Sequence, residues 1–487
     1  MAGIGFELKK IYRKEGIARS AVGIMYSTLV TIGPMVLVVG AIMLMYLLLG
    51  ISDVNYADRE LLSTTILYTF TFSIILTSPF NVVLSRFLAD KFYLNQYDGI
   101  LNSFYLGVTV CGGMASLAFM PVGYSLHVNG GVELSFLYAA YVQWISLVIL
   151  FFSITYLHAT KDYKMISFFF LLGMATSIVM GMTFHFGWGL EVIYAILYGL
   201  AAGFFVTSVC CYTYIRRYFS KTSGSYGDSM KYFGTYKKLL MANLFYMLGL
   251  YIHNFVFWTV PGRSITANTL YSNQAYDMAT YLAMFTNISA MVSFTVVVET
   301  KFHTTYKEYM EAVLGGTYKM IMKSKKAMFR TLSQQIGQIF GTQIAITSVL
   351  YILIATFGPK IGIDSVTMAI YPILVVAFLG IFMMYGNLVY LYYFADMNGA
   401  VWTGVIFAVV TFVGTLFSKN LMPNFWGLGA FFGMLAGWTF SFFRIRWIER
   451  NIDAYIFCDY KVIDTMKSSN KGKVVYTNRN RNGNSTK

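Results

Sequence analysis

The side chains best suited to contact a polar ligand are three amides and one histidine that lie inside long uncharged stretches. His253 and Asn254 are adjacent in the run YIHNF, while Asn81 and Asn287 lie in two other stretches. Amide and imidazole groups donate and accept hydrogen bonds, so they suit either a path for a polar molecule or a bond between helices. We predict Asn81, His253, Asn254 and Asn287 as substrate-path candidates, with interhelical bonds as the alternative.

Charged side chains stand at the ends of these stretches. A charge at the centre of a bilayer costs about 2.5–3.5 kcal/mol and normally marks an ion path or an anion site. No Asp, Glu, Lys or Arg occupies such a central position, which favours a neutral polar cargo. Arg86, Glu299 and Lys301 lie close to stretch ends, and we predict them as a cytoplasmic gate or a docking point for a partner.

The chain lacks the patterns that enzymes and metal proteins use. It has no nucleophile triad, phosphate-binding loop or suitably paired carboxylates, and its four cysteines lack the spacing of metal ligands. We therefore expect no enzymatic activity, no cofactor and no metal.

The uncharged stretches themselves predict the fold class. Each is long enough to cross a bilayer as a helix, which requires about 20 mostly apolar residues. The composition agrees, since 57% of residues are hydrophobic and only 12% are charged. We predict an all-α integral membrane protein with twelve transmembrane helices in the stretches 20–52, 61–85, 99–132, 134–160, 165–190, 192–215, 239–262, 278–298, 331–359, 365–395, 397–418 and 420–443.

The basic residues predict the orientation. Of 36 Lys and Arg residues, 32 fall in the two termini and in alternate loops, and only 4 fall in the other loops. The positive-inside rule places the 32, and with them both termini, in the cytoplasm. The net charge of +15 follows from this bias and suits contact with anionic membrane lipids, so we expect no nucleic-acid partner.

The first six uncharged stretches and the last six are related by an internal repeat. Six positions correspond at an offset of 215: Ser78, Val82, Val83, Ser85, Arg86 and Phe87 to Ser293, Val297, Val298, Thr300, Lys301 and Phe302. Tyr156, Leu157 and Asp162 correspond to Tyr390, Leu391 and Asp396 at an offset of 234. Such a duplication is typical of transporters with a site between two lobes. We predict a six-helix lobe at 1–215, a cytoplasmic linker at 216–238, a second lobe at 239–447, and a basic cytoplasmic tail at 448–487 with a disordered end.

Two prolines lie inside predicted helices. Pro34 follows Gly33 in the first stretch, and Pro79 lies in the second. Proline removes a backbone donor and clashes with the preceding turn, which bends a helix. We predict Pro34 and Pro79 as hinge candidates, with simple packing as the alternative.

The chain begins with Met1-Ala2-Gly3-Ile4-Gly5-Phe6-Glu7-Leu8, followed by Lys9, Lys10 and Ile11, and this start resembles that of the Pel exopolysaccharide transporter family, PelG. The resemblance continues over the membrane part, including Gly33-Pro34, Ser78-Pro79-Phe80-Asn81 and the turn at Asp162. It implies the superfamily of MATE transporters and polysaccharide flippases, in which two six-helix lobes form a V around a central cavity.

The resemblance also implies a function. A nascent polysaccharide rich in N-acetylhexosamine would cross the bacterial inner membrane, in a complex with a cytoplasmic glycosyltransferase, a cyclic-di-GMP-responsive regulator and other membrane proteins of the synthase. The alternatives are an ion-coupled exporter of small molecules, like MATE proteins, and a flippase for lipid-linked oligosaccharides. A membrane glycosyltransferase would need larger outer loops than these.

Overall fold

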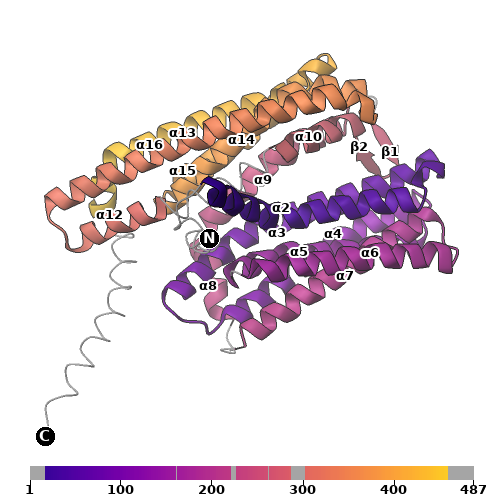
Figure 1. Cartoon of the computed structure of the whole chain (residues 1–487), viewed down its shortest axis with the longest axis horizontal. Coiled ribbons are helices and arrows are strands. Elements are labelled where there is room, and N and C mark those ends of the chain that lie inside the picture. Colours follow the sequence, from indigo (N-terminus) through magenta and orange to yellow (C-terminus); the bar gives the residue numbers. More distant parts are fainter. Residues whose placement is uncertain (1–16, 161, 221–225, 261–262, 287–301, 459–487) are drawn as a thin grey trace, which may run out of the picture.

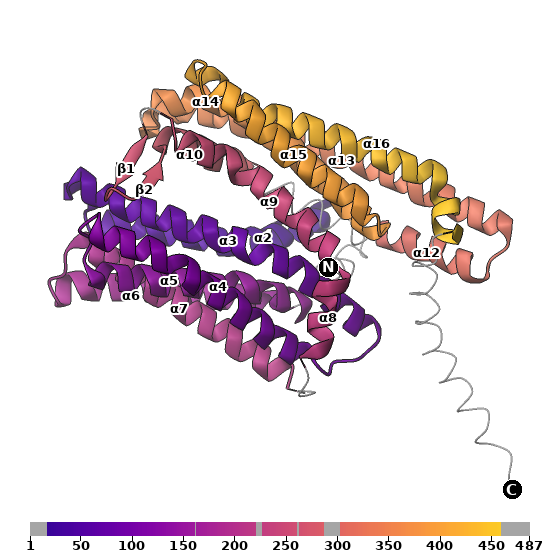
Figure 2. The same cartoon turned by 180° about the vertical axis from the view of Figure 1, so that it is seen from behind.

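The computed structural model describes residues 17–160, 162–220, 226–260, 263–286 and 302–458, which form long helices joined by short turns. The helices make two bundles that lie side by side. One helix of the second bundle, α9 (Lys237–Phe257), runs between them, and a small β-hairpin bridges them at one end (Figures 1 and 2). The predicted helical architecture is confirmed.

The first lobe contains six helices of the first half of the chain. A 3₁₀ turn follows the first of them, and a π-helical turn at Thr183–Gly187 extends the fifth. The helices are α2 (Ile17–Leu48), α3 (Tyr56–Tyr93), α4 (Ile100–Val128), α5 (Leu134–Thr160), α6 (Tyr163–Met182) and α7 (Val192–Tyr218).

The second lobe follows a short helix, α8 (Gly227–Thr235), which packs on α3 and α4 of the first lobe. Short 3₁₀ turns precede α14 and α16. Besides α9, the elements of this half are β1 (Ser264–Thr266), β2 (Leu270–Ser272), α10 (Gln274–Thr286), α12 (His303–Gly315), α13 (Tyr318–Phe357), α14 (Ser365–Tyr393), α15 (Met397–Ser418) and α16 (Leu428–Cys458).

A described helix occupies each of the twelve uncharged stretches. Within the described residues, ten helices are long and apolar enough to cross a membrane. In α2 the described apolar part, Gly33–Leu48, is shorter, and α10 has 13 described residues before it reaches 287–301, outside the described part. The structure is therefore consistent with twelve spans and identifies ten by length and composition.

Each lobe has its own hydrophobic core. One cluster of buried side chains comes from α2 to α7, and the other from α9 to α16. Leu270 of β2 belongs to the first cluster although it lies in the second half of the chain, so the hairpin inserts a side chain into the opposite lobe. The predicted boundaries of lobes, linker and tail stay a prediction, and α16 continues through 448 to Cys458.

Small residues let neighbouring helices approach closely in equivalent places of both lobes. A Cβ on Gly203 of α7 would lie 2.5 Å from the carbonyl oxygen of Gly173 on α6. A Cβ on Gly433 of α16 would lie 1.9 Å from Thr411 Oγ1 on α15. Glycine is required at both positions because any side chain would push the helices apart.

The repeated tyrosines also occupy equivalent places. Tyr156 and Tyr390 are fully buried, and each hydroxyl bonds to the helix that precedes its own. The oxygens of Tyr156 and Ser103 are 2.9 Å apart, and the Tyr390 hydroxyl donates to Gln335 Oε1 at 3.4 Å. This correspondence agrees with the internal repeat that the sequence predicts.

Helix α3 buries a row of hydroxyl groups without losing hydrogen bonds. Thr65, Thr69, Ser73 and Thr77 each donate to the carbonyl four residues earlier, at 2.6–2.9 Å. Bonds of this type satisfy the hydroxyl inside an apolar environment and tend to bend a helix. The row leads directly to Pro79, which is buried within the same helix.

Candidate functional site

The surface between the lobes is the place where the two halves of the chain meet, and the β-hairpin closes one end of it. The hydroxyl of Tyr68 on α3 accepts from the backbone N–H of Tyr271 at 3.0 Å and donates to its carbonyl at 2.8 Å. The Tyr68 side chain thus satisfies the outer edge of β2. We call this side of the molecule the hairpin end, and the opposite side, which carries α8 and α12, the α8 end (Figure 1).

Further polar contacts attach the hairpin to α3 and α4. Thr64 and Thr266 hydroxyls are 3.4 Å apart, Ser125 and Thr269 hydroxyls are 3.1 Å apart, and Asn268 Nδ2 donates to the carbonyl of Asn129 at 3.1 Å. Three residues lie between the last paired residues Thr266 and Leu270, and two of them, Ala267 and Asn268, have positive φ. A tight turn therefore presents polar groups of the second lobe to the first.

Aromatic stacking continues this contact toward the middle of the interface. Tyr68 stacks on Trp258 with ring centres 4.9 Å apart, and Phe72 stacks on Phe255 at 5.6 Å. Thr71 lies about one helical turn after Tyr68 on α3. Its hydroxyl is 3.1 Å from the hydroxyl of Tyr281 on α10. The lobes are thus joined by both apolar and polar contacts over the outer part of α3 and α9.

A buried carboxylate supports the hairpin end from within the second lobe. Asp277 is 4% exposed and accepts from Asn254 Nδ2 at 2.6 Å, from Trp258 Nε1 at 3.0 Å and from the backbone N–H of Asn273 at 3.1 Å. These three donors satisfy the hydrogen-bonding capacity of a carboxylate that is withdrawn from water. The same tryptophan stacks on Tyr68, so the network links the carboxylate to the interface between the lobes.

At the α8 end, a hydrogen bond between described residues joins α3 and α9. Asn243 Nδ2 of α9 donates to Ser78 Oγ of α3 at 2.7 Å. On α8, Tyr232 donates to Asp90 at 3.3 Å, and burial together with this carboxylate raises the pKa of Tyr232 to about 12. The hydroxyl therefore stays protonated and remains a donor at physiological pH.

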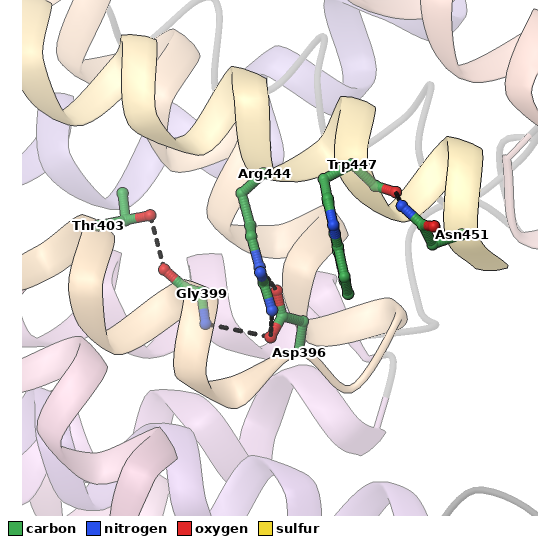
Figure 3. A network of polar contacts seen from close by, with 6 residues as sticks. All are labelled: Asp396, Gly399, Thr403, Arg444, Trp447 and Asn451. Carbon is green, nitrogen blue, oxygen red and sulfur yellow. Dashed lines mark hydrogen bonds and ion pairs between the residues drawn. The ribbon is translucent and has the colours of Figure 1, made fainter. Parts of the chain in front are cut away.

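A bidentate ion pair anchors the start of α15 at the same end of the second lobe (Figure 3). Asp396 is 2% exposed, and Arg444 of α16 donates to it from Nε at 2.5 Å and from Nη2 at 3.1 Å. The backbone N–H of Gly399 adds a third bond at 3.1 Å, as in a helix N-cap. The guanidinium also lies 4.3 Å from the ring centre of Trp447.

Comparison with families of known proteins gives a match over residues 1–457 to the PelG family, described as "Putative exopolysaccharide Exporter (EPS-E)". The chain belongs to the PelG family. No protein with a curated description matches it.

Solved structures similar to this PelG-family chain are MATE and related transporters. The bent form of the Vibrio cholerae MATE transporter VcmN has a TM-score of 0.60 and 11% identity, covering 93% of this chain and 99% of its own. A Pyrococcus furiosus transporter of the MOP superfamily has a TM-score of 0.58 and 13% identity, covering 88% and 96%. The TM-scores establish the shared fold. With ten described helices long and apolar enough to cross a membrane, the chain is a multi-pass membrane protein.

The PelG-family chain holds its predicted path residues inside single lobes. Asn81 Nδ2 donates to the carbonyl of Phe151 on α5 at 3.2 Å. His253 is fully buried, with Nδ1 2.9 Å from the hydroxyl of Tyr276, and Asn254 bonds to Asp277. The uncharged stretch 239–262 puts His253 and Asn254 some residues before its end, but α9 ends at Phe257 and leaves both close to its last turn.

The other predicted residues have different placements. Arg86 lies 3.3 Å from Asp90 and its guanidinium faces the ring of Tyr236 at 5.9 Å. Pro34 and Pro79 lie within continuous helices, so the structure places them where a bend is possible. Their roles stay predictions. The remaining candidates lie outside the described residues: Asn287, Glu299 and Lys301.

Sequence reasoning missed several features of the PelG-family chain. Pro372 lies inside α14, and Pro121 lies inside α4, which continues to Val128. The burial of Asp277 and the hairpin at 264–272 were also missed. A signal existed for Asp277, since an acid one residue outside an uncharged stretch lies near enough to the membrane to be buried. In the described part of the chain, no group of three or more His, Cys, Asp or Glu side chains is placed to hold a metal.

Proposed function

We propose that this protein moves an exopolysaccharide of the Pel type, rich in N-acetylhexosamine, from the cytoplasm to the outside across the bacterial inner membrane. The observation that carries this proposal is the family match over residues 1–457. The transporter fold, with polar and aromatic contacts between its lobes, supports it. By the charge rule both termini and the α8 end are cytoplasmic, and the hairpin end faces outward.

The lobes then have to separate at the hairpin end for a polymer to leave. The contacts of Tyr68, Thr64 and Ser125 with the hairpin hold this end together. Each contact is individually weak, at about 0.5–1.5 kcal/mol for a neutral hydrogen bond. A set of weak bonds can be broken during a transport cycle more easily than one continuous apolar core.

A second candidate is an ion-coupled exporter, and the buried Asp277 is the observation that favours it. Buried carboxylates inside membrane proteins often mark ion paths. Against this role, donors from its own lobe already occupy both oxygens of Asp277. Asp277→Asn separates the two candidates. Export that continues in this variant, and that persists after collapse of the sodium and proton gradients, argues against ion coupling.

The partner in this proposal is a cytoplasmic glycosyltransferase, and α13 offers a surface for it. Residues 318–330 extend this helix by about 20 Å beyond its uncharged part, at 1.5 Å per residue. Lys319, Lys323, Lys326 and Arg330 are exposed and repeat at helical spacing, so they form one basic stripe. Lys325 pairs with Asp453 of α16 at 2.6 Å and fixes the extension to the lobe.

The test uses a disulfide across the hairpin end. In a variant lacking Cys111, Cys210, Cys211 and Cys458, Thr64→Cys with Thr266→Cys places two thiols where hydroxyls lie 3.4 Å apart. Cells carrying this pair should secrete polymer when the pair is reduced and stop when it is oxidised.

The matched control is Ser264→Cys with Ser272→Cys, which links paired residues of the same hairpin without joining the lobes. Secretion should continue when this pair is oxidised. Normal polymer secretion by cells from which the gene has been deleted would overturn the proposed function.

A further inference from the structure

Helix α8 is attached to the first lobe, although it follows that lobe in the chain. The Tyr232 hydroxyl of α8 donates to Asp90 of α3 at 3.3 Å, and its ring meets the ring of Phe87 edge-on, with ring centres 5.0 Å apart. Near the start of α8, the carboxylate of Asp228 lies 3.9 Å from Lys91 Nζ. A hydrogen bond, a ring contact and an ion pair therefore join α8 to the last turns of α3.

One face of α8 makes these contacts. Ser229, Tyr232, Phe233 and Tyr236 recur at intervals of three and four residues, so they lie on the same side of the helix. Ser229 is buried, and the ring of Phe233 packs against the core of the first lobe, 5.9 Å from the ring of Phe80. The face of α8 that is withdrawn from water is thus covered by the first lobe.

Helix α9, which follows directly, belongs to the second lobe. Lys238 in its first turn donates to Asn398 Oδ1 on α15 at 2.7 Å. One turn later, a Cβ on Gly404 of α15 would lie 2.8 Å from the carbonyl oxygen of Ala242, and Ala242 is fully buried in the core of the second lobe. Consecutive helices are therefore fixed to different lobes.

Tyr236 is the one residue between the two helices, since α8 ends at Thr235 and α9 begins at Lys237. Its φ of −104° and ψ of 32° lie outside helical geometry. Its N–H donates to the carbonyl of Tyr232 at 2.8 Å, and its carbonyl accepts from the N–H of Leu239 at 3.0 Å. Rotation about φ or ψ of this residue turns α9 relative to α8, while each of these bonds stays within its own helix.

The side chain of Tyr236 remains on the first-lobe side of this junction. Its ring stacks on Tyr232 with ring centres 5.4 Å apart, and the guanidinium of Arg86 on α3 faces it at 5.9 Å. Arg86 in turn lies 3.3 Å from Asp90. The residue that leads into the second lobe is thus seated on α3.

We infer that α8 moves as part of the first lobe, and that Tyr236 is the hinge on which the second lobe turns at the α8 end. This inference rests on the proposed function, because export between two lobes requires them to change their relative position. A hinge of this kind changes two dihedral angles. If α8 moved with the second lobe instead, each cycle would break its contacts with Asp90, Lys91 and the buried Phe87.

The experiment places a reversible link on either side of Tyr236, in the intact protein without its four cysteines. Lys91→Cys with Asp228→Cys connects α3 to α8, and a membrane-permeant bis-methanethiosulfonate reagent bridges the two thiols. Because both helices belong to one moving unit, cells carrying this pair should secrete as much polymer after treatment as before. Mass spectrometry of the purified protein measures the extent of linking.

Ser78→Cys with Asn243→Cys is the matched pair. It starts from the same helix, α3, but reaches α9 beyond the hinge, where the two side chains are 2.7 Å apart. Oxidation should join these thiols as a disulfide, and secretion should then be lost because the second lobe can no longer turn. Dithiothreitol cleaves both kinds of link and should restore secretion, which shows that the linked protein was folded.

Two results would overturn the inference. One is a loss of secretion when α3 is linked to α8, and the other is undiminished secretion when α3 is linked to α9. In both cases the proposed export function would stand, because the variants restore secretion to a deletion strain before they are linked. If the unmodified protein failed to restore secretion to that strain, the export proposal itself would fail.

Discussion

The two lobes hold equivalent helix starts in different ways. In the first lobe, Asp162 precedes α6, accepts from the backbone N–H of Met165 at 3.4 Å and receives the hydroxyl of Tyr214 on α7 at 2.7 Å. In the second lobe, Asp396 has the same place before α15, but its partner on α16 is Arg444. The capping carboxylate is therefore bonded by a neutral hydroxyl in the first lobe and by a cationic guanidinium in the second.

The replacement of a tyrosine by an arginine as the partner of the cap restricts the residue three positions after the capping aspartate. Gly399 corresponds to Met165 at the repeat offset of 234, and both donate a backbone N–H to the capping carboxylate. A Cβ on Gly399 would lie 2.8 Å from Cγ of Arg444, which crosses the helix start there. The arginine fills the space that a side chain would need, so the second lobe requires glycine where the first carries methionine.

The difference also changes the cost of losing one partner. Asp396 is 2% exposed, whereas the carboxylate of Asp162 is only half-buried and can be hydrated. A buried charge left without its counter-ion is far more destabilising than a hydrated one that loses a hydrogen bond. The same cap thus contributes more to stability in the second lobe.

The largest expected effect follows removal of the cation. Arg444→Met should lower the free energy of unfolding by about 3–5 kcal/mol, because Asp396 stays buried with only the Gly399 N–H as a described partner. Thermal unfolding in detergent and the amount of protein in the membrane measure the loss. Arg444→Lys is the control that keeps the charge and should lose less. An Arg444→Met variant as stable as the unmodified protein would contradict the role given to the pair.

The double variant Asp396→Asn with Arg444→Met sharpens the comparison. It removes both charges and keeps an amide that can still cap α15, so it should be destabilised by roughly 1–2 kcal/mol, less than Arg444→Met alone. The same unfolding measurement applies. Losses that simply add would show that the two residues do not act as a pair.

A methyl group at Gly399 should lower the free energy of unfolding by about as much as the double variant Asp396→Asn with Arg444→Met, or slightly less. Gly399→Ala places its Cβ 2.3 Å from Asp396 Oδ2, and relief of this clash should cost about 1–2 kcal/mol. The matched change in the first lobe, Met165→Ala, has no arginine to displace and should cost less. Equal losses at both positions would mean that the arginine does not impose the glycine.

The smallest expected effect concerns the neutral donor. Tyr214→Phe removes one hydrogen bond to Asp162, and water can replace it because this carboxylate is half-buried. The expected loss is about 1 kcal/mol, visible as a small decrease in the unfolding temperature. A loss as large as that of Arg444→Met would remove the distinction between the lobes.

Much of the fold could be predicted because the bilayer imposes a simple rule on sequence. Backbone groups in hydrocarbon must bond within a helix, so uncharged stretches such as 134–160 reveal α5 to within a residue. The Asp162 and Asp396 repeat also appeared in the sequence, since a helix cap is a local feature. The partners of these caps did not appear, because Tyr214 and Arg444 reach them from helices later in the chain.

The candidate site was predicted less well than the fold. His253 and Asn254 were selected for polarity, and the structure bonds them to Tyr276 and Asp277 within their own lobe. Polarity in a sequence shows that a group needs a partner, but not whether that partner is protein or ligand.

The sequence by itself determined the membrane class, the helical segments, the internal repeat and the family resemblance. These follow from local composition, spacing and short motifs, which the chain carries without reference to its folded form. The tertiary structure alone decided that Leu270 enters the opposite core, that Tyr68 closes the edge of β2, and that Arg444 rather than a tyrosine neutralises Asp396. Such contacts join residues far apart in the chain, and their geometry depends on how whole helices pack.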